Sequence, residues 1–204
     1  MSPSKYRLRR VFSGAVKALA KPFIKFNIHP TAVTYISLFF AFLSALTLVL
    51  TQNPQVYALL VFLTGLFDGV DGAVARATGK SSDSGAFSDS VVDKVAEFLI
   101  LLPLAIILPN SIVLGVSVPV WVLVCISSWL LTSYTRSRAA SLGVEDLDVG
   151  LGARSERLFI LVVFAFFGLV QIGLVIVTLV GAGTAFFRYL HYSEVLQKRD
   201  LSER

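Results

Sequence analysis

The sequence predicts an all-α integral membrane protein with six transmembrane helices. The chain of 204 residues is 55% hydrophobic and only 15% charged, which is far more apolar than soluble domains are. Asp, Glu, Lys and Arg are absent from 27–67, 98–135 and 158–187, so the apolar residues form three blocks. A helix needs about 20 apolar residues to cross a bilayer. Each block is therefore too long for a single crossing and is expected to hold two helices.

The first element that we expect is a basic amphipathic helix within residues 1–27. Seven Lys and Arg residues occur before position 26, and apolar residues recur between them at roughly helical spacing. This pattern is typical of a helix that lies on an anionic membrane surface. An ordinary positively charged flank of the first membrane helix is the alternative. The segment lacks the compact apolar region and cleavage site of a signal peptide, so we expect it to remain in the mature protein.

Each apolar block divides at a turn. The first two blocks contain uncharged polar turn sequences at 51–54 and 108–111, and the third has a glycine-flanked stretch at 168–173 around Gln171. The predicted transmembrane helices are 31–51, 55–77, 85–108, 111–139, 155–170 and 173–195. We expect a single domain, 1–204, with the six-helix bundle at 31–195.

The charges predict the orientation of these helices. Six crossings place both termini and the connections 76–80 and 136–157 on one side, which then carries the Lys and Arg residues. The positive-inside rule makes that side cytoplasmic. Five or seven crossings would put basic segments on both faces. The sequence thus predicts a multi-pass cell-membrane protein with both termini, and any site at these connections, on the cytoplasmic side.

Charge distribution and cysteine content exclude other classes. The net charge is +5, but the charges gather at the ends of the apolar blocks, which argues for membrane lipids and against a nucleic-acid partner. Cys125 is the single cysteine, so an intramolecular disulfide is impossible and a zinc site is not indicated. We interpret Cys125 as a packing residue.

Four carboxylates are expected at the cytoplasmic ends of the second and third membrane helices. Asp68 and Asp71 are three residues apart, and Asp89 and Asp93 are four apart, so each pair projects from one helical face. An unpaired carboxylate in hydrocarbon costs several kcal/mol. The short connection predicts that the two helices are antiparallel neighbours. The four carboxylates would then converge and repel one another unless cations neutralise them, and oxygen ligands in this number suit Mg²⁺ or Mn²⁺.

Other residues of this segment allow several functions. Gly72 and Gly85 would let a ligand approach the backbone, and Arg76 could pair with a phosphate. Glycines also line ordinary helix contacts, which is the simpler interpretation of Gly69. The acidic cluster alone fits an ion-coupled transporter as well as an enzyme.

The complete pattern resembles the signature of the CDP-alcohol phosphotransferases: Asp68-x-x-Asp71-Gly72-x-x-Ala75-Arg76, eight residues, then Gly85-x-x-x-Asp89-x-x-x-Asp93. No fixed position departs from it. The resemblance implies transfer of a phosphate-linked lipid from a CDP carrier to a hydroxyl group, with release of CMP. It also implies the six-helix layout with both ends inside, and commonly a homodimer. A transporter is disfavoured by the Gly and Arg spacing, and an inactive scaffold by the presence of all four Asp residues.

The resemblance also assigns roles to the signature residues. Two divalent ions, Mg²⁺ or Mn²⁺, would be held by Asp68, Asp71, Asp89 and Asp93, and Asp93 would act as the base. Gly72, Ala75, Arg76 and Gly85 would bind the CDP-lipid. Lys94 and Glu97 follow on the third helix, and Glu97 continues the face of Gly85, Asp89 and Asp93. We leave both outside the catalytic set.

A second group of residues concerns the acceptor. Arg136, Arg154, Arg157 and Arg188 would favour a phosphorylated acceptor, because Arg binds phosphate through two hydrogen bonds. Membrane anchoring and contact with lipid headgroups are the alternative. Segments 133–139 and 154–158 resemble those of phosphatidylinositol phosphate and archaetidylinositol phosphate synthases. That branch implies inositol 1-phosphate as acceptor, with Ser133 and Arg138 as additional candidates at the site.

The acceptor and the lipid keep alternatives. Bacterial members of that branch usually carry Lys where this chain has Arg136, and another small phosphorylated alcohol, glycerol 3-phosphate, is the alternative acceptor. The lipid chains, diacylglycerol or archaeol, leave no signal in the sequence, because burial of hydrocarbon is non-directional.

Overall fold

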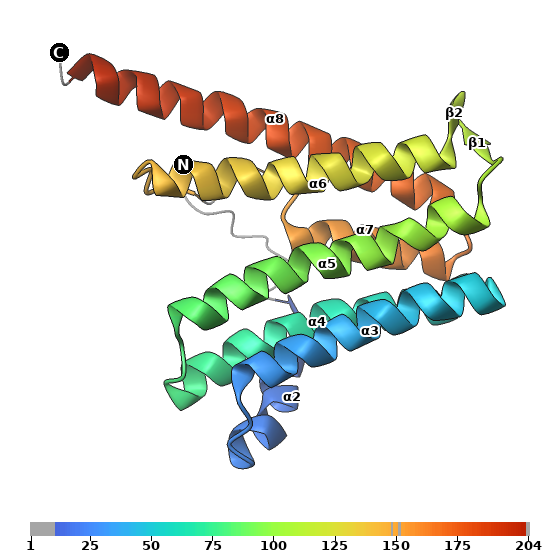
Figure 1. The fold of residues 1–204 in the computed structure, drawn as a ribbon, viewed down its shortest axis with the longest axis horizontal. Coiled ribbons are helices and arrows are strands. Elements are labelled where there is room, and N and C mark those ends of the chain that lie inside the picture. The colour runs from blue at the N-terminus through green and yellow to red at the C-terminus, as the bar shows by residue number, and fades with distance from the viewer. Residues whose placement is uncertain (1–10, 148, 151, 203–204) are drawn as a thin grey trace.

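The structure is a computed structural model that describes residues 11–147, 149–150 and 152–202 (Figure 1). Nearly all of the described chain is helical. The elements in chain order are α2 (Ser13–Lys25), α3 (Pro30–Thr51), α4 (Pro54–Thr78), α5 (Asp83–Ile107), β1 (Ile112–Val113), β2 (Val116–Ser117), α6 (Val118–Ser141), α7 (Arg154–Phe166) and α8 (Val170–Ser202). Each of the six long helices that the sequence predicts has a counterpart among α3 to α8.

Polar caps and proline fix the boundaries of the helices that carry the carboxylates. The Asn53 side chain accepts hydrogen bonds from the backbone of Gln55 and Val56, and Pro54 occupies the first turn of α4. Gly79, at φ 67°, ends α4 in the left-handed conformation. Ser82 then caps α5 through the N–H of Gly85. These local signals explain why the predicted ranges 55–77 and 85–108 lie close to the observed ones.

The predicted start of the fourth long helix was wrong. We placed it at residue 111, but α6 begins at Val118, after a β-hairpin in which Val113 pairs with Val116. The two residues of the turn, Leu114 and Gly115, both have positive φ, the conformation that tight two-residue hairpin turns require. Apolar composition alone does not separate such a short hairpin from a helix end.

The last helix is longer than predicted, and the turn before it is tighter. α7 ends at Phe166, Gly168 adopts φ 74°, and α8 starts at Val170. Gln171, the polar residue that marked this turn, accepts a hydrogen bond from Ser111 Oγ at 3.1 Å. The two polar turns of the second and third blocks therefore meet at the same end of the molecule.

The helices form two groups that α7 joins. α3 packs along both α4 and α5, and α6 packs along α8 and α5, whereas α7 lies between α4 and α8 (Figure 1). α5 packs mainly on α3 and α6. It also meets α4 through side chains: the Tyr57 hydroxyl of α4 donates a hydrogen bond to the Ile100 carbonyl of α5 at 2.9 Å, and carboxylates of the two helices approach one another. The prediction that α4 and α5 are neighbours is therefore confirmed, with the contact made by side chains.

Among the described residues, the helices α3, α4, α6 and α8 are long and apolar enough to cross a membrane. A buried apolar core, with Tyr57, Ile100 and Trp129 among its largest members, joins α3 to α8. The protein is thus a helical membrane protein.

An amphipathic helix, α2, is present within the predicted range 1–27. Its apolar face, which includes Ala20, packs against Val70 and Val74 of α4, while Lys17, Lys21 and Lys25 are exposed. Residues 1–10 of the predicted segment lie outside the described residues. Contact with α4 gives α2 a fixed place next to the helix that bears Asp68 and Asp71.

Candidate active site

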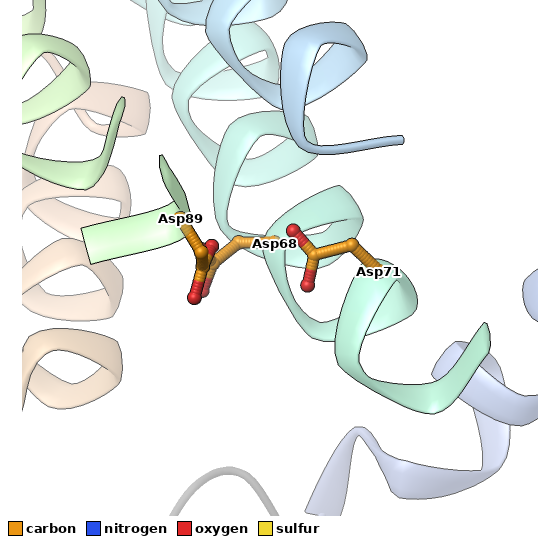
Figure 2. Close-up of side chains that lie close together, drawn as sticks. All are labelled: Asp68, Asp71 and Asp89. Carbon is orange, nitrogen blue, oxygen red and sulfur yellow. The ribbon is translucent and has the colours of Figure 1, made fainter. Parts of the chain in front are cut away.

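Three of the four predicted carboxylates form one cluster. Asp68 and Asp71 project from consecutive turns of α4, and Asp89 faces them from the first half of α5 (Figure 2). One oxygen of each of the three carboxylates lies within 4.8 Å of the others. Asp71 is buried, and Asp68 and Asp89 are half-buried. Oxygen atoms at this separation are close enough to share a divalent cation, so these residues fit the predicted Mg²⁺ or Mn²⁺ site.

A neighbouring helix holds Asp71 in place. The hydroxyl of Thr34, on α3, donates a hydrogen bond to Asp71 Oδ2 at 2.8 Å. The carbonyl of Pro30 is farther from the same hydroxyl, at 3.4 Å. Since a hydroxyl has one proton to donate, the shorter contact indicates that Asp71 receives it. This orients the carboxylate toward Asp68 and Asp89.

Asp93 lies beside Asp68 and shares an arginine with it. Arg154, the first residue of α7, places Nη1 2.5 Å from Asp68 Oδ1 and 2.9 Å from Asp93 Oδ1. The side chain of Arg154 is only 15% exposed. A guanidinium from α7 thus bridges the carboxylates of α4 and α5. Arg154 is one of the predicted acceptor-phosphate residues.

Glu97, one helical turn after Asp93 on α5, is surrounded by three cationic side chains. Its side chain is 5% exposed and accepts from Lys94 Nζ at 2.7 Å, and its Oε1 lies 3.4 Å from Arg154 Nε. Arg157 Nη2 is 4.0 Å from the same oxygen, and the Arg157 guanidinium lies over the Trp129 ring at 4.5 Å. Arg157 is 1% exposed. The structure therefore places Arg157 in the core beside Glu97, below Arg154.

The residues predicted to bind the CDP-lipid lie in the C-terminal half of α4 and in the first turn of α5. Arg76 is exposed, and its guanidinium folds back over Gly72, so that a Cβ at Gly72 would meet Nη1 at 3.2 Å. Ala75 is half-buried beside them, and Gly85 stands in the first turn of α5. Arg76 also borders a pocket of about 420 Å³ between α2 and α4, together with Lys17 and Gly69.

The other predicted acceptor residues are spread over α6 and α8. Arg188 is buried and donates to the carbonyls of Val149 and Thr132, at 3.0 and 2.6 Å. Arg136 and Arg138 are exposed on the last turns of α6, and Ser133 Oγ donates to the Trp129 carbonyl. Arg154 is the member of this group that directly contacts the predicted metal ligands in the described part of the chain.

Two contributions to this site were missed at the sequence level. Thr34 carries no distinguishing signal, because threonines are frequent in membrane helices and often bond to their own backbone. In the sequence, Trp129 cannot be distinguished from other apolar core residues, so its contact with Arg157 was not predicted. For Glu97 a signal was present, namely its position on the acidic face of α5, but nothing in the sequence indicates that three cations gather around it.

Comparison with known proteins agrees with this geometry. The family description "CDP-alcohol phosphatidyltransferase" matches residues 27–187. An archaetidylinositol phosphate synthase of Pyrococcus horikoshii is 32% identical over 176 residues, covering 85% of this chain and 88% of its own. A phosphatidylinositol phosphate synthase of Cutibacterium acnes is 30% identical over 172 residues, covering 81% and 79%.

A solved structure shares the fold. The phosphatidylinositol phosphate synthase of Mycobacterium tuberculosis, in complex with manganese and citrate, superposes with a TM-score of 0.73 at 24% identity, covering 87% of this chain and 88% of that one. The family match spans the carboxylate signature and five of the six long helices completely, and it reaches into α8 as far as residue 187. The chain therefore belongs to the CDP-alcohol phosphatidyltransferase family.

Proposed function

We propose that this membrane enzyme transfers a phosphatidyl-type group, diacylglycerol phosphate or archaeol phosphate, from a CDP-linked lipid to the hydroxyl of inositol 1-phosphate and releases CMP. The observation that carries the proposal is the contact of Arg154 with Asp68 and Asp93. It puts a phosphate-binding guanidinium directly beside the carboxylates of the family signature. The names of the relatives from Pyrococcus and Cutibacterium support the same acceptor.

In this proposal the four carboxylates hold two divalent ions, Mg²⁺ or Mn²⁺. Such ions would neutralise charge on the diphosphate and on the leaving CMP. Asp93 accepts the proton of the attacking hydroxyl, which is a step that needs a carboxylate within hydrogen-bond reach of the acceptor. Its contact with Arg154 puts Asp93 on the side of the cluster that faces the proposed acceptor residues.

The two substrates are assigned to opposite sides of the carboxylates. Gly72, Ala75, Arg76 and Gly85 bind the CDP-lipid, whose phosphates suit the exposed Arg76 guanidinium. Arg154 and Arg136 bind the acceptor phosphate, with Ser133 and Arg138 at the rim. Arg157 and Arg188 are buried, so we assign them a supporting role: they shape the pocket from beneath.

We further propose six crossings, with α5 and α7 completing the four clearly apolar spans. The charged residues of α5 occupy its first half, and its second half is uncharged. α7 has 13 residues, which span about 20 Å, so it starts below the membrane surface at the depth of the carboxylates. The active site would then open to the cytoplasmic side of the cell membrane, within a single domain that assembles as a homodimer.

The test is CMP release by the protein purified in detergent. CDP-diacylglycerol and CDP-archaeol are supplied with Mg²⁺ or Mn²⁺ and with inositol 1-phosphate, glycerol 3-phosphate, inositol or serine. We expect metal-dependent release with inositol 1-phosphate. Asp93→Asn should abolish it, whereas Asp200→Asn, at an exposed position near the end of α8, should not. Release with glycerol 3-phosphate alone would refute the acceptor assignment, and no release at all would refute the reaction.

A further inference from the structure

Arg154 contacts two of the carboxylates that are proposed to hold divalent ions. Its Nη1 touches Asp68 Oδ1 and Asp93 Oδ1, on two different helices, at 2.5 and 2.9 Å. A divalent ion on these carboxylates would stand next to the guanidinium. Two cations at such a distance repel strongly in a partly desolvated site, and a guanidinium has no lone pair with which to bind a metal. Arg154 and a metal ion therefore compete for the same carboxylates.

We propose that Arg154 is the counter-cation of the carboxylates when no metal is bound. Binding of a divalent metal displaces the Arg154 guanidinium from the carboxylates, and the guanidinium then binds the phosphate of the acceptor. The inference rests on the proposed metal site and states what Arg154 binds before and after metal and acceptor are present. In the absence of metal, Arg154 neutralises the repulsion among the carboxylates. When metal and acceptor are present, the same side chain pairs with phosphate.

The surroundings of Arg154 allow such an exchange. Glu97 Oε1 lies 3.4 Å from Arg154 Nε, whereas the carboxylate contacts are made by Nη1 of the same guanidinium. Glu97 is 3% exposed and belongs to α5. It would keep a charge partner for Arg154 while Nη1 changes its contact, so that the buried cation is never left without compensation. Glu97 is thus a positioning residue for Arg154.

The exchange makes two binding events dependent on each other. An anion that holds Arg154 away from Asp68 and Asp93 raises the affinity of these carboxylates for metal, and by linkage metal raises the affinity for the anion to the same extent. Coupling of this kind is typically about 5- to 150-fold. Each substrate site would then be completed only when the other components are present.

The experiment measures Mn²⁺ binding directly, without catalysis. Free Mn²⁺ is followed by electron paramagnetic resonance during titration of the purified protein in detergent. Wild type is compared with Arg154→Gln and with the matched control Arg199→Gln, which removes an exposed arginine near the end of α8. Wild type is also titrated in sulfate, a tetrahedral dianion, and in chloride at equal ionic strength, with protein-free titrations to correct for association of Mn²⁺ with sulfate.

We expect Arg154→Gln to bind Mn²⁺ about tenfold more tightly than wild type in chloride, and Arg199→Gln to match wild type. Sulfate should tighten Mn²⁺ binding to wild type, a comparison that needs no folded variant, and should have no effect on Arg154→Gln. Equal or weaker binding by folded Arg154→Gln, or no sulfate effect on wild type, would overturn the exchange while leaving the metal site intact. Failure of folded wild type to bind Mn²⁺ would instead overturn the metal site on which it rests.

Discussion

Thr34 is the residue through which α3 contributes to the acidic site. It carries no charge and would not contact either substrate in the proposed mechanism, yet its hydroxyl is the donor that holds Asp71 Oδ2 at 2.8 Å. A hydrogen bond to a charged group contributes about 1.5–3 kcal/mol. Removing it frees the rotation of a buried carboxylate that must point toward its neighbours.

Thr34→Val should therefore weaken Mn²⁺ binding by about tenfold or more and lower CMP release at limiting metal. The matched control is Thr64→Val in α4, where a buried threonine donates only to the Leu60 carbonyl of its own helix. Metal titrations of the two variants decide the matter. An equal loss in both would mean that burial of the hydroxyl, and not its bond to Asp71, is responsible.

Gly72 matters because of the arginine that lies over it. A Cβ at this position would meet Arg76 Nη1 at 3.2 Å, so Gly72→Ala should push the guanidinium away from its present place. We expect the KM for the CDP-lipid to rise several-fold with little change in metal affinity. Gly65→Ala is the control on the same helix, since its Cβ would make an ordinary contact of 3.6 Å with Leu158. A normal KM in Gly72→Ala would refute the role of Arg76.

At the scale of elements, the hairpin between α5 and α6 lies at the end of the molecule away from the site, so a substitution in it should affect stability and not catalysis. Gly115 has φ 76°, and an L-residue in this conformation costs about 1 kcal/mol. Gly115→Ala should lower the melting temperature by a few degrees and leave the KM values unchanged. Gly183→Ala, on α8 with open space around its Cβ, should be neutral. A loss of activity in Gly115→Ala would connect the hairpin to catalysis.

α7, the shortest of the six helices α3 to α8, supplies the arginine of the site. It packs on α4 and α8 and delivers Arg154 and Arg157 from its first turns. Arg154 reaches the carboxylates, and Arg157, one turn later, is enclosed by Glu97 and Trp129. One helix thus supplies both a charge for the site and a charge for the core beneath it.

At the scale of the whole molecule, Glu97 and Arg157 join three helices. Glu97 belongs to α5, Arg157 to α7, and Trp129, which stacks on Arg157, to α6. α5 and α7 are each packed on other helices, so this contact helps to fix their relative positions. Removing one partner of a buried ion pair typically costs about 3–5 kcal/mol, because the other charge remains without compensation.

Glu97→Gln should therefore destabilise the protein by about 3 kcal/mol, which thermal unfolding in detergent would detect. Arg157→Gln alone should cost a similar amount, and the double variant should lose less than the sum of the two, as expected for groups that interact. Strict additivity would contradict a direct interaction between them. Glu194→Gln, an exposed residue of α8 paired with Lys198, should change stability little.

The positions of the long helices follow from the sequence, because local chemistry decides them. Blocks of apolar residues, proline and asparagine at 53–54 and glycine at 79 act within a few residues of where they stand. The start of α6 was predicted wrongly because its local signal is weak: the two-residue turn at Leu114 and Gly115 lies in an apolar stretch. The order in which helices pack is not local, and the main packing of α5 on α3 and α6 has no signal in the sequence.

By itself the sequence determined the family signature, the helical membrane fold and the four carboxylates, since spacing along a helix fixes which side chains share a face. Only the tertiary structure decided which charges meet: Thr34 with Asp71, Arg154 with Asp68 and Asp93, and Glu97 with Arg157. Each of these contacts joins residues of different helices, far apart in the sequence. Electrostatic interaction depends on distance in space and on burial, and neither quantity exists until the helices have packed.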